Sequence, residues 1–407
     1  MPGPLADVRI LDLTTMVSGP VATMMLGDQG ADVIKIESPS GDLMRHYGVM
    51  RNGMSSAFLS SNRSKRSLCV NIKAKEGLEI VRKLVAKADV LVQNFRPGAI
   101  ERMGLGEAEV RKLRPDIIFV SITGFGDTGP YAHQRVYDPI IQALCGLAEI
   151  QADRHLDGRP RMVRTIIPDK TTAVTTAQAI TAALFARERT KQGQHIRIAM
   201  LDVMVAYLWP EAISSLSFVG HEADPTLGQM GLDLVYKTKD GYITAGALSN
   251  SEWEGMCRAL NCEHLVSDPR FGSVALRGKN SVERRSITSG EIEKWPSKEI
   301  LKRLDEHGVP CAPVLSRTDL LENEQVRINK LIEVHENASF GPVRQPRPAA
   351  LFDRTPARIA RMAPFLGADN ADILTELGYS GDDIGRFARE EVLGGQSAQR
   401  RQEPADG

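Results

Sequence analysis

Short apolar runs and longer segments with helically spaced apolar side chains take turns along the first two hundred residues. The short runs are rich in β-branched residues and predict buried strands at 8–13, 31–37, 90–95, 117–122 and 195–200. The longer segments predict helices near 20–28, 75–88, 107–114 and 170–187. Strands that alternate with helices in this way form βαβ units in a mostly parallel sheet covered on both faces. We therefore expect a large α/β domain with a Rossmann-like core over residues 1–220.

The pattern changes beyond about residue 222 and predicts a smaller α+β domain over residues 225–325. Two short strands flank Lys239-Asp240-Gly241, and an Asp-Gly pair suits a hairpin turn. Helical segments follow near 251–260, 280–290 and 297–307, and then comes a short apolar run at 310–314. From about residue 350 the pattern indicates a last strand and helices. The polar residues 396–407 are expected to be disordered.

Composition is that of an ordinary globular protein with room for two or three domains. The 51 basic and 51 acidic side chains cancel, so no overall field attracts nucleic acid or an anionic membrane. Asp7 and Asp12 interrupt the first thirty residues, and no apolar run approaches the ~18 residues that a membrane span needs. We expect neither a secreted nor a membrane protein, with neither nucleic acid nor membrane among its partners.

Cysteines and short motifs narrow the chemistry. The five cysteines are scattered, without a CxxC pair or the spacing of a zinc site, and indicate reduced packing residues in a cytoplasmic protein. Neither the phosphate-loop motif GxxxxGK[ST] nor the dinucleotide motif GxGxxG occurs, and GxSxG and HExxH are also absent. We expect no metal and no redox cofactor.

Three short segments offer candidate chemistry, and each also has a purely structural explanation. Asp169 follows a proline at the start of the predicted helix 170–187, where an aspartate at the N-cap position needs no further role. The turn Ser18-Gly19-Pro20 can aim backbone N–H groups at an anion, or simply connect a strand to a helix. Residues 94–98 follow a predicted strand at the carboxyl edge of the sheet, where open α/β folds bind ligands, or they are simply a connecting loop.

Six segments in the same order and spacing resemble the class III coenzyme A-transferases of the formyl-CoA transferase type. That superfamily also contains the α-methylacyl-CoA racemases. The resemblance extends from about Leu11 to about Val314. The segments that carry it are 11–42, 62–68, 70–77, 88–105, 122–147 and 221–246.

The resemblance implies roles for particular residues. Asp169 would be the catalytic nucleophile, and a glycine-bearing loop at 227–231 would close over the site. The residues implied for the active-site wall or the substrate loop are Val17, Ser18, Tyr137, Gly228, Gln229 and Gly231. The residues implied for coenzyme A binding are Met16, Val17, Ser18, Val70, Lys73, Asn94, Phe95, Arg96, Arg102, Arg135 and Met200.

Three positions depart from patterns within the superfamily. Formyl-CoA transferases usually have glutamine where this chain has Val17, which argues against oxalate and formate as substrates. Ser38 replaces a usual arginine. Racemases carry a His-Asp pair where this chain has Tyr137-Asp138, and a phenol is a poor acceptor of an α-proton at neutral pH. Transferases of the family often have tyrosine followed by an acidic residue at this point.

The expected function is CoA transfer from an acyl-CoA to a small carboxylic acid, through a covalent intermediate on Asp169. The alternatives are an α-methylacyl-CoA racemase or epimerase, in which Asp138 pairs with Asp169 through water, and a non-catalytic CoA-binding protein. Arg45, Arg51 or Arg164 could select a dicarboxylate. The resemblance also implies an interlocked homodimer and a C-terminal segment, 340–395, that returns to the large domain.

Overall fold

The computed structural model describes residues 2–152, 158–222 and 234–395. The chain divides into two compact units, one made of residues 1–228 and 331–407 and the other of residues 229–330. The predicted disorder of residues 396–407 concerns positions outside the described residues. We treat the two units separately below.

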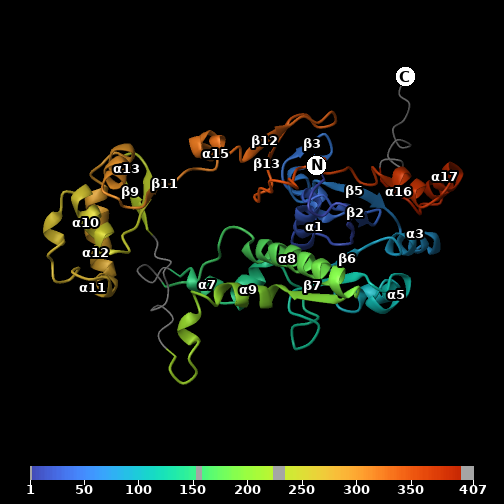
Figure 1. Ribbon diagram of the computed structural model, residues 1–407, viewed down its shortest axis with the longest axis horizontal. Coiled ribbons are helices and arrows are strands. Elements are labelled where there is room, and N and C mark those ends of the chain that lie inside the picture. The colour runs from blue at the N-terminus through green and yellow to red at the C-terminus, as the bar shows by residue number, and fades with distance from the viewer. Residues whose placement is uncertain (1, 153–157, 223–233, 396–407) are drawn as a thin grey trace. The chain divides into compact units, whose positions relative to one another are not determined.

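The first unit is built on a six-stranded parallel sheet with strand order β5-β2-β1-β6-β7-β8 (Figure 1). All five strands predicted in the first two hundred residues are present, which confirms a mostly parallel α/β sheet. The last strand predicted beyond residue 350 is wrong, because the described residues there contain helices and no strand. The sixth strand, β5, was not predicted because it begins with polar residues, of which Lys65 is completely buried. The strands are β1 (Arg9–Asp12), β2 (Asp32–Glu37), β5 (Lys65–Cys69), β6 (Val90–Gln93), β7 (Ile118–Thr123) and β8 (His195–Ala199).

Helices cover both faces of this sheet because successive strand residues point to opposite sides. Ile10 and Val33 pack on the face covered by α1 (Ser18–Asp28) and α8 (Ile167–Thr190). Leu11 and Ile34 pack on the other face. The helices that cover that other face are α3 (Lys75–Val85), α5 (Glu107–Leu113), α16 (Asn370–Glu376) and α17 (Gly381–Arg389).

The order of the strands reverses between β1 and β6. From β1 the chain builds outward through β2 to β5, and then returns to build β6, β7 and β8 on the other side. Loops at the carboxyl ends of the two strands therefore diverge and leave a crevice. The loops that follow β1 and β6 contain residues 14–17 and 94–98.

The C-terminal part of the chain packs on β5, the edge strand. Asp369 accepts the N–H of Ser67 at 2.8 Å, and Asn370 accepts the N–H of Cys69 at 2.8 Å. These side chains thereby pair backbone N–H groups of the edge strand that would otherwise be free to bind another strand.

The remaining elements of this unit are α2 (Ser56–Asn62), α4 (Ala99–Arg102), α6 (Asp138–Leu144), α7 (Leu147–Ile150), α9 (Met200–Leu208), the 3₁₀ turns η1 (Leu43–His46) and η2 (Ser214–Leu216), and the pairs β3 (Met50–Arg51) with β4 (Met54–Ser55) and β12 (Ile332–His335) with β13 (Val343–Pro346).

The second unit is a three-stranded antiparallel sheet packed with helices. The predicted hairpin is present, and Thr238 N–H donates to the carbonyl of Gly241 at 3.0 Å across its turn. Trp253 and Phe271 lie in its core. Its elements are β9 (Val235–Lys237), β10 (Tyr242–Ala245), α10 (Asn250–Ala259), η4 (Glu263–Leu265), α11 (Val274–Lys279), α12 (Ser281–Ile292), α13 (Ser297–Glu306), β11 (Cys311–Pro313), α14 (Asp319–Glu322) and α15 (Glu324–Ile328). Among the described residues, no helix is both long and apolar enough to cross a membrane.

Candidate active site

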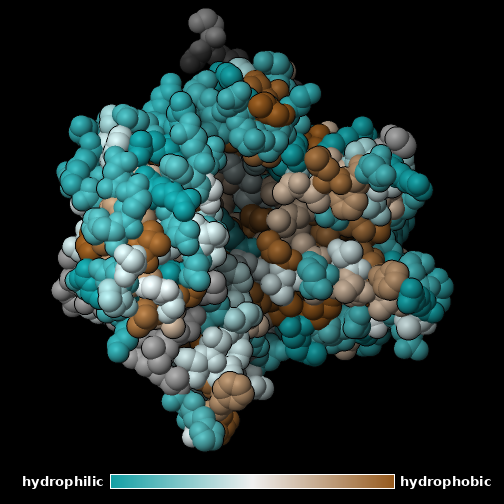
Figure 2. Space-filling model, turned by 60° about the vertical axis from the view of Figure 1, so that its left-hand side comes forward, coloured by the Kyte–Doolittle hydropathy of each residue, from teal (hydrophilic) through white to brown (hydrophobic). Residues whose placement is uncertain are grey.

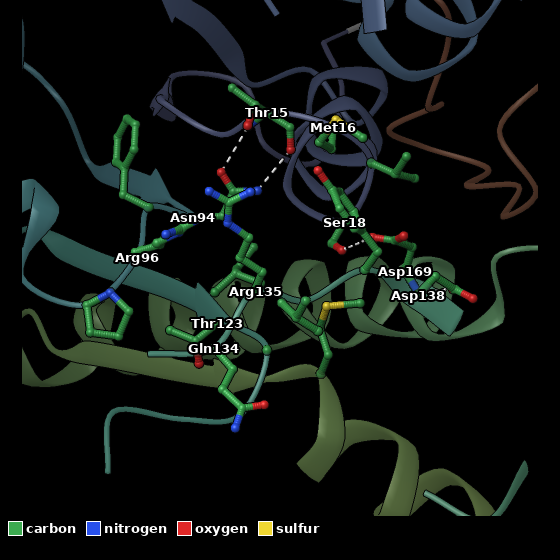
Figure 3. Close-up of a pocket in the computed structure, with 18 of the residues that line it drawn as sticks. Thr15, Met16, Ser18, Asn94, Arg96, Thr123, Gln134, Arg135, Asp138 and Asp169 are labelled. Atoms are coloured by element: carbon green, nitrogen blue, oxygen red, sulfur yellow. Dashed lines mark hydrogen bonds between the residues drawn. The ribbon is translucent and has the colours of Figure 1, made fainter. Parts of the chain in front are cut away.

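A cavity of about 330 Å³ lies in the first unit, where the loops after β1, β6 and β7 meet the first turns of α1, α6 and α8 (Figure 3). It therefore occupies the crevice at the reversal of strand order. The predicted site residues that line it are Met16, Val17, Ser18, Asn94, Phe95, Arg96, Arg135, Tyr137, Asp169 and Met200, and Asp138 lines it as well.

Asp169 reaches this cavity from the first turn of α8. Figure 3 shows its carboxylate and the Ser18 side chain pointing toward each other, and the Ser18 hydroxyl donates a hydrogen bond to Oδ1 of Asp169. Burial raises the pKa of Asp169 above its usual range, and the charge of Asp138 raises it further, while Ser18 works in the opposite direction. A carboxylate removed from water is a better nucleophile and base than an exposed one.

The structural explanation of Asp169 as a helix N-cap is wrong. Helix α8 begins at Ile167, three residues earlier than predicted, and Ile166 occupies the N-cap position without a side-chain hydrogen bond. Pro168 at the second helical position fits a helix start because its fixed φ suits the first turn. The side-chain hydrogen bond that Asp169 receives comes from α1, so its position in the cavity needs another explanation.

Asp138 holds the backbone of Asp169 in place. Its buried carboxylate accepts the Asp169 N–H at Oδ2 (3.2 Å) and the Gln142 side-chain N–H at Oδ1 (2.6 Å). Gln142 in turn accepts the N–H of Val163 at 2.9 Å. Asp138 thus contacts the Asp169 backbone directly. Gln142 was missed by the sequence analysis, and its position one helical turn after Asp138 was the available signal.

A buried ion pair supports the loop that carries Met16. Met16 has a left-handed backbone conformation (φ 68°), which a side chain other than glycine adopts at a cost. Its N–H donates to Asp42 at 3.2 Å, and Asp42 pairs with Lys35 at 3.1 Å. The Lys35 ammonium also donates to the carbonyl of Thr14 at 2.8 Å. Lys35 and Asp42 are fully buried, and hydrophobic patterning gave no sign of them.

Asn94 joins two walls of the cavity. Its side-chain oxygen accepts the N–H of Thr15 at 3.0 Å, and its side-chain nitrogen donates to the Thr15 carbonyl at 2.8 Å (Figure 3). Thr15 follows β1 and Asn94 follows β6, so this pair ties together the two loops at the strand reversal. The amide of Asn94, which the resemblance assigns to coenzyme A, is engaged with the protein backbone.

A second cavity of about 510 Å³ shares Thr15 and Phe95 with the first. Val70 and Lys73, two further residues implied in coenzyme A binding, line it, and so does Ser38. The predicted residues are therefore divided between two neighbouring cavities, a layout suited to an elongated ligand. Arg102 lies at the end of α4 and lines neither cavity. The predicted loop residues Gly228, Gln229 and Gly231 lie outside the described residues.

The arginines proposed to grip a second carboxylate lie elsewhere. Arg45 pairs with Glu37 at 2.7 Å and stacks on the ring of Phe58, 3.7 Å from its centroid. Neither Arg51 nor Arg164 lines either cavity. Sequence order could not reveal the placement of Arg45, because Glu37 and Phe58 direct its guanidinium. Within the described ranges, Arg96 and Arg135 are the arginines that line the cavity of Asp169.

Comparison with known proteins gives a consistent result. The profile of CoA-transferase family III matches residues 5–370. A mouse protein named succinyl-CoA:glutarate CoA-transferase is 37% identical over 380 residues, covering 92% of this chain and 86% of its own. The formyl-CoA:oxalate CoA-transferase of Escherichia coli is 30% identical, covering 97% of this chain and 100% of its own. A crystal structure of a CaiB/BaiF family protein from Brucella suis superposes with a TM-score of 0.81 at 29% identity, covering 93% of this chain and 100% of that one.

Proposed function

The chain belongs to CoA-transferase family III, and we propose that it moves CoA from an acyl-CoA thioester to a free carboxylic acid through covalent catalysis at Asp169. The observation that carries this proposal is the Asp169 carboxylate, held by Ser18 in a cavity lined by cationic and amide side chains. Its raised pKa supports a nucleophilic role. The substrates are an acyl-CoA and a small carboxylic acid.

The proposed reaction has four steps. The Asp169 carboxylate attacks the thioester carbonyl, which forms a mixed anhydride and releases the CoA thiolate. The thiolate attacks the aspartyl carbonyl, giving an enzyme–CoA thioester and the free carboxylate of the donor acid. The acceptor carboxylate attacks this thioester, which again gives an anhydride and the thiolate. Attack of the thiolate on the acceptor's acyl carbon then releases the new acyl-CoA and restores Asp169.

Positioning must supply much of the rate, since a carboxylate is a weak nucleophile. Good alignment of reacting groups is worth about 7–11 kcal/mol of barrier. Asp138 fixes the backbone of Asp169, and Ser18 fixes its carboxylate. The first turn of α1 lines the same cavity beside the Asp169 carboxylate, so the positive end of that helix favours negative charge that develops there.

We propose a dicarboxylic acyl group, such as succinyl, for the CoA donor. The mouse protein above is named for succinyl-CoA, and a protein from Agrobacterium fabrum, 33% identical over 389 residues, is named succinate–glutarate CoA-transferase. Arg96 and Arg135 line the cavity of Asp169, and both are exposed residues. A guanidinium suits a carboxylate because its two parallel N–H groups match the two oxygens.

We also propose that two copies of the chain assemble. Figure 2 shows one face on which apolar side chains gather in patches. Outward-facing apolar residues occur on neighbouring elements of the first unit. They include Val174 (54% exposed) and Phe185 (59%) on α8, Tyr207 (61%) on α9, and Phe218 (73%), which follows η2. Such exposure marks a surface that another protein covers, and in this proposal the other protein is a second copy.

Trapping the intermediate tests the mechanism. The protein is incubated with a set of acyl-CoA esters and quenched with hydroxylamine, and peptides are analysed by mass spectrometry. Conversion of Asp169 to its hydroxamate, with no other aspartate modified, is the expected result. If Asp169 stays unmodified with every donor, the nucleophilic role is wrong.

The racemase alternative is tested by deuterium. A racemase exchanges the α-hydrogen of a 2-methylacyl-CoA with D₂O, whereas the transferase mechanism leaves it in place. No histidine lines the cavity of Asp169 among the described residues, and Tyr137 stands where racemases have one. We therefore expect no exchange during turnover.

A further inference from the structure

A chain of four hydrogen bonds crosses three strands of the sheet in the first unit, from the first residue of β8 to the last residue of β6. Oε2 of Glu107, in the first turn of α5, lies 2.6 Å from Nδ1 of His195 on β8. Nε2 of His195 lies 2.9 Å from Oγ of Ser121 on β7. Nε2 of Gln93 on β6 donates to the same Oγ at 2.9 Å, and Oε1 of Gln93 accepts the backbone N–H of Phe95 at 2.7 Å. We call the side chains of Glu107, His195, Ser121 and Gln93 the edge relay.

The sheet itself brings these groups together. Gln93 is in register with Ser121, so their side chains lie beside each other on one face of two adjacent strands. Ser121 is in register with Arg197 on β8, and His195, two residues earlier, projects from the same face. Gln93 and Ser121 are 4% and 6% exposed. A break in this relay would therefore leave buried polar atoms without partners, which is costly.

One arrangement of protons makes all four bonds and also gives the hydroxyl proton of Ser121 an acceptor. Phe95 N–H must donate to Gln93, whose amide group then donates to Ser121. The hydroxyl of Ser121 has its own proton left to donate to Nε2 of His195. Nδ1 of His195 then carries the ring proton and donates it to Glu107. This arrangement requires a neutral imidazole.

The residue types Ser121, His195 and Glu107 also match a hydrolytic triad, but the surroundings do not suit one. Ser121 lies within β7, paired on both sides by β6 and β8, so its backbone is used in the sheet. A serine nucleophile needs free N–H groups beside it to bind an oxyanion. The hydroxyl of Ser121 already accepts from Gln93. The relay is therefore better explained as a positioning device.

The relay ends at the residue that the cavities have in common. Phe95 lines both cavities described above and a third one of about 250 Å³, which the relay residues also line. We propose that the edge relay positions Phe95 and the loop 94–97 for acyl-CoA binding, and that it does so best while His195 is neutral. The identity of the ligand rests on the proposed function, whereas the coupling of His195 to Phe95 does not.

Charges around His195 determine when it takes up a proton. Burial lowers the pKa of His195 and Arg197 lowers it further, while Glu107 and Asp127 raise it, and the net direction is downward. Glu107 is itself paired with Arg111 at 2.9 Å. The remaining neighbour, Phe119, is uncharged and meets the imidazole edge to face, with centroids 5.0 Å apart. His195 is therefore neutral at neutral pH.

Protonation of His195 reverses the direction of its hydrogen bond with Ser121, because Nε2 then carries a proton. The protonated Nε2 of His195 would donate to Oγ of Ser121. The hydroxyl proton of Ser121 would then lose Nε2 as its acceptor. Gln93 could offer its oxygen to that proton only by turning its amide, which would aim its N–H groups at the N–H of Phe95. Two donors cannot bond to each other. Acyl-CoA binding should therefore weaken as the pH falls through the titration of His195.

The first test needs no ligand. Protein labelled with ¹⁵N-phenylalanine gives one amide signal for each of its 11 phenylalanines, and Phe95→Leu identifies the signal of Phe95. Ring signals of the eight histidines, with His195→Asn for assignment, report the titration of His195. We expect the Phe95 amide to shift with that titration in the native protein but not in Ser121→Ala. A Phe95 signal that stays constant while His195 titrates overturns the proposal.

The second test measures binding of free CoA by calorimetry. Ser121→Ala should raise the Kd about threefold to tenfold at neutral pH, as expected for one lost buried hydrogen bond, and should remove the pH dependence seen in the native protein. Ser121→Thr keeps the hydroxyl and should restore tight binding. Glu101→Gln, which alters the third cavity outside the relay, serves as the matched control. Unchanged CoA affinity in a folded Ser121→Ala protein overturns the positioning role. If the native protein does not bind CoA, the proposed function is contradicted instead. The amide signal of Phe95 then remains the only test of whether His195 is coupled to Phe95.

Discussion

The Ser18 hydroxyl donates a hydrogen bond to the carboxylate of Asp169, although 151 positions of the chain separate the two residues. This bond joins the first turn of α1 to the first turn of α8. Both helices direct their positive ends toward the cavity, where negative charge is favoured. Ser18 thereby stabilises the ionised form of a carboxylate that burial would otherwise protonate more readily.

Asp169→Asn should abolish CoA transfer without loss of the fold. We expect a fall in kcat of at least about 10³-fold, the order found when a catalytic nucleophile is removed. Because the pKa of Asp169 is raised in the folded protein, the folded state holds this proton to higher pH than the unfolded chain does. At neutral pH the ionised carboxylate therefore costs stability, and the neutral amide should leave the Tm equal or higher. Asp353→Asn, at an exposed position, is the matched control for steady-state rates and calorimetry. A Tm well below that of the control would show that Asp169 is structural.

The fall of kcat/KM at acid pH should move in opposite directions in Ser18→Ala and Asp138→Asn. Transfer requires ionised Asp169, so kcat/KM falls as the pH drops through the pKa of this carboxyl. Ser18→Ala removes a hydrogen bond that lowers this pKa, and should move the fall to higher pH. Asp138→Asn removes a charge that raises it, and should move the fall to lower pH. Shifts in the same direction would mean that another group controls the profile.

Arg135→Gln distinguishes two uses of the guanidinium in the cavity. If Arg135 binds the second carboxylate of a dicarboxylic acyl group, KM for succinyl-CoA should rise about tenfold or more, and KM for butyryl-CoA should change little. An equal rise for both esters would indicate that Arg135 binds the CoA part, as the family resemblance implies. Steady-state kinetics with the two donors, and Arg164→Gln as an exposed control, decide between these outcomes.

Asp42→Ala should destabilise the protein by about 3–5 kcal/mol, because it leaves the buried ammonium of Lys35 without its partner. It should also reduce kcat/KM, since Met16 loses the acceptor of its N–H in the wall of the cavity. Urea unfolding measures the first effect. The double variant Lys35→Met with Asp42→Leu replaces the pair by apolar groups and should recover part of the stability. If the single variant unfolds at the native urea concentration, the ion pair does not support this loop.

The apolar surface of α8 and α9 should be covered in solution. Light scattering with size-exclusion chromatography is expected to give twice the chain mass of 44.6 kDa. Val174→Glu combined with Tyr207→Glu places two charges on exposed apolar positions and should shift the protein toward the monomer. Glu188→Gln, on the same helix but at an exposed polar position, should leave the mass unchanged. A native protein that is monomeric at all concentrations contradicts the proposed assembly.

Local pattern predicted most of the sheet and failed at one strand. Val90–Gln93 and Ile118–Thr123 are strongly apolar, and their burial follows from their composition. Lys65–Cys69 was missed because its first residues are polar. Lys65 is buried with an ion pair to Asp12 at 2.8 Å and with hydrogen bonds to Pro20 and Asn62. Hydrophobic periodicity reflects the preference of apolar side chains to leave water. It therefore cannot identify a charged side chain that is buried with a partner from a distant part of the sequence.

The sequence by itself determined the alternation of strands and helices, the chemical groups available for the reaction and the family to which the chain belongs. Only the tertiary structure decided which of these groups meet. It brought Ser18 to Asp169 and Glu107 through His195 to Phe95, and it turned Arg45 to Glu37 and away from the cavity. The physical reason is that periodicity depends on near neighbours in the chain, whereas the environment of a charged side chain depends on partners that the fold brings from far along the sequence.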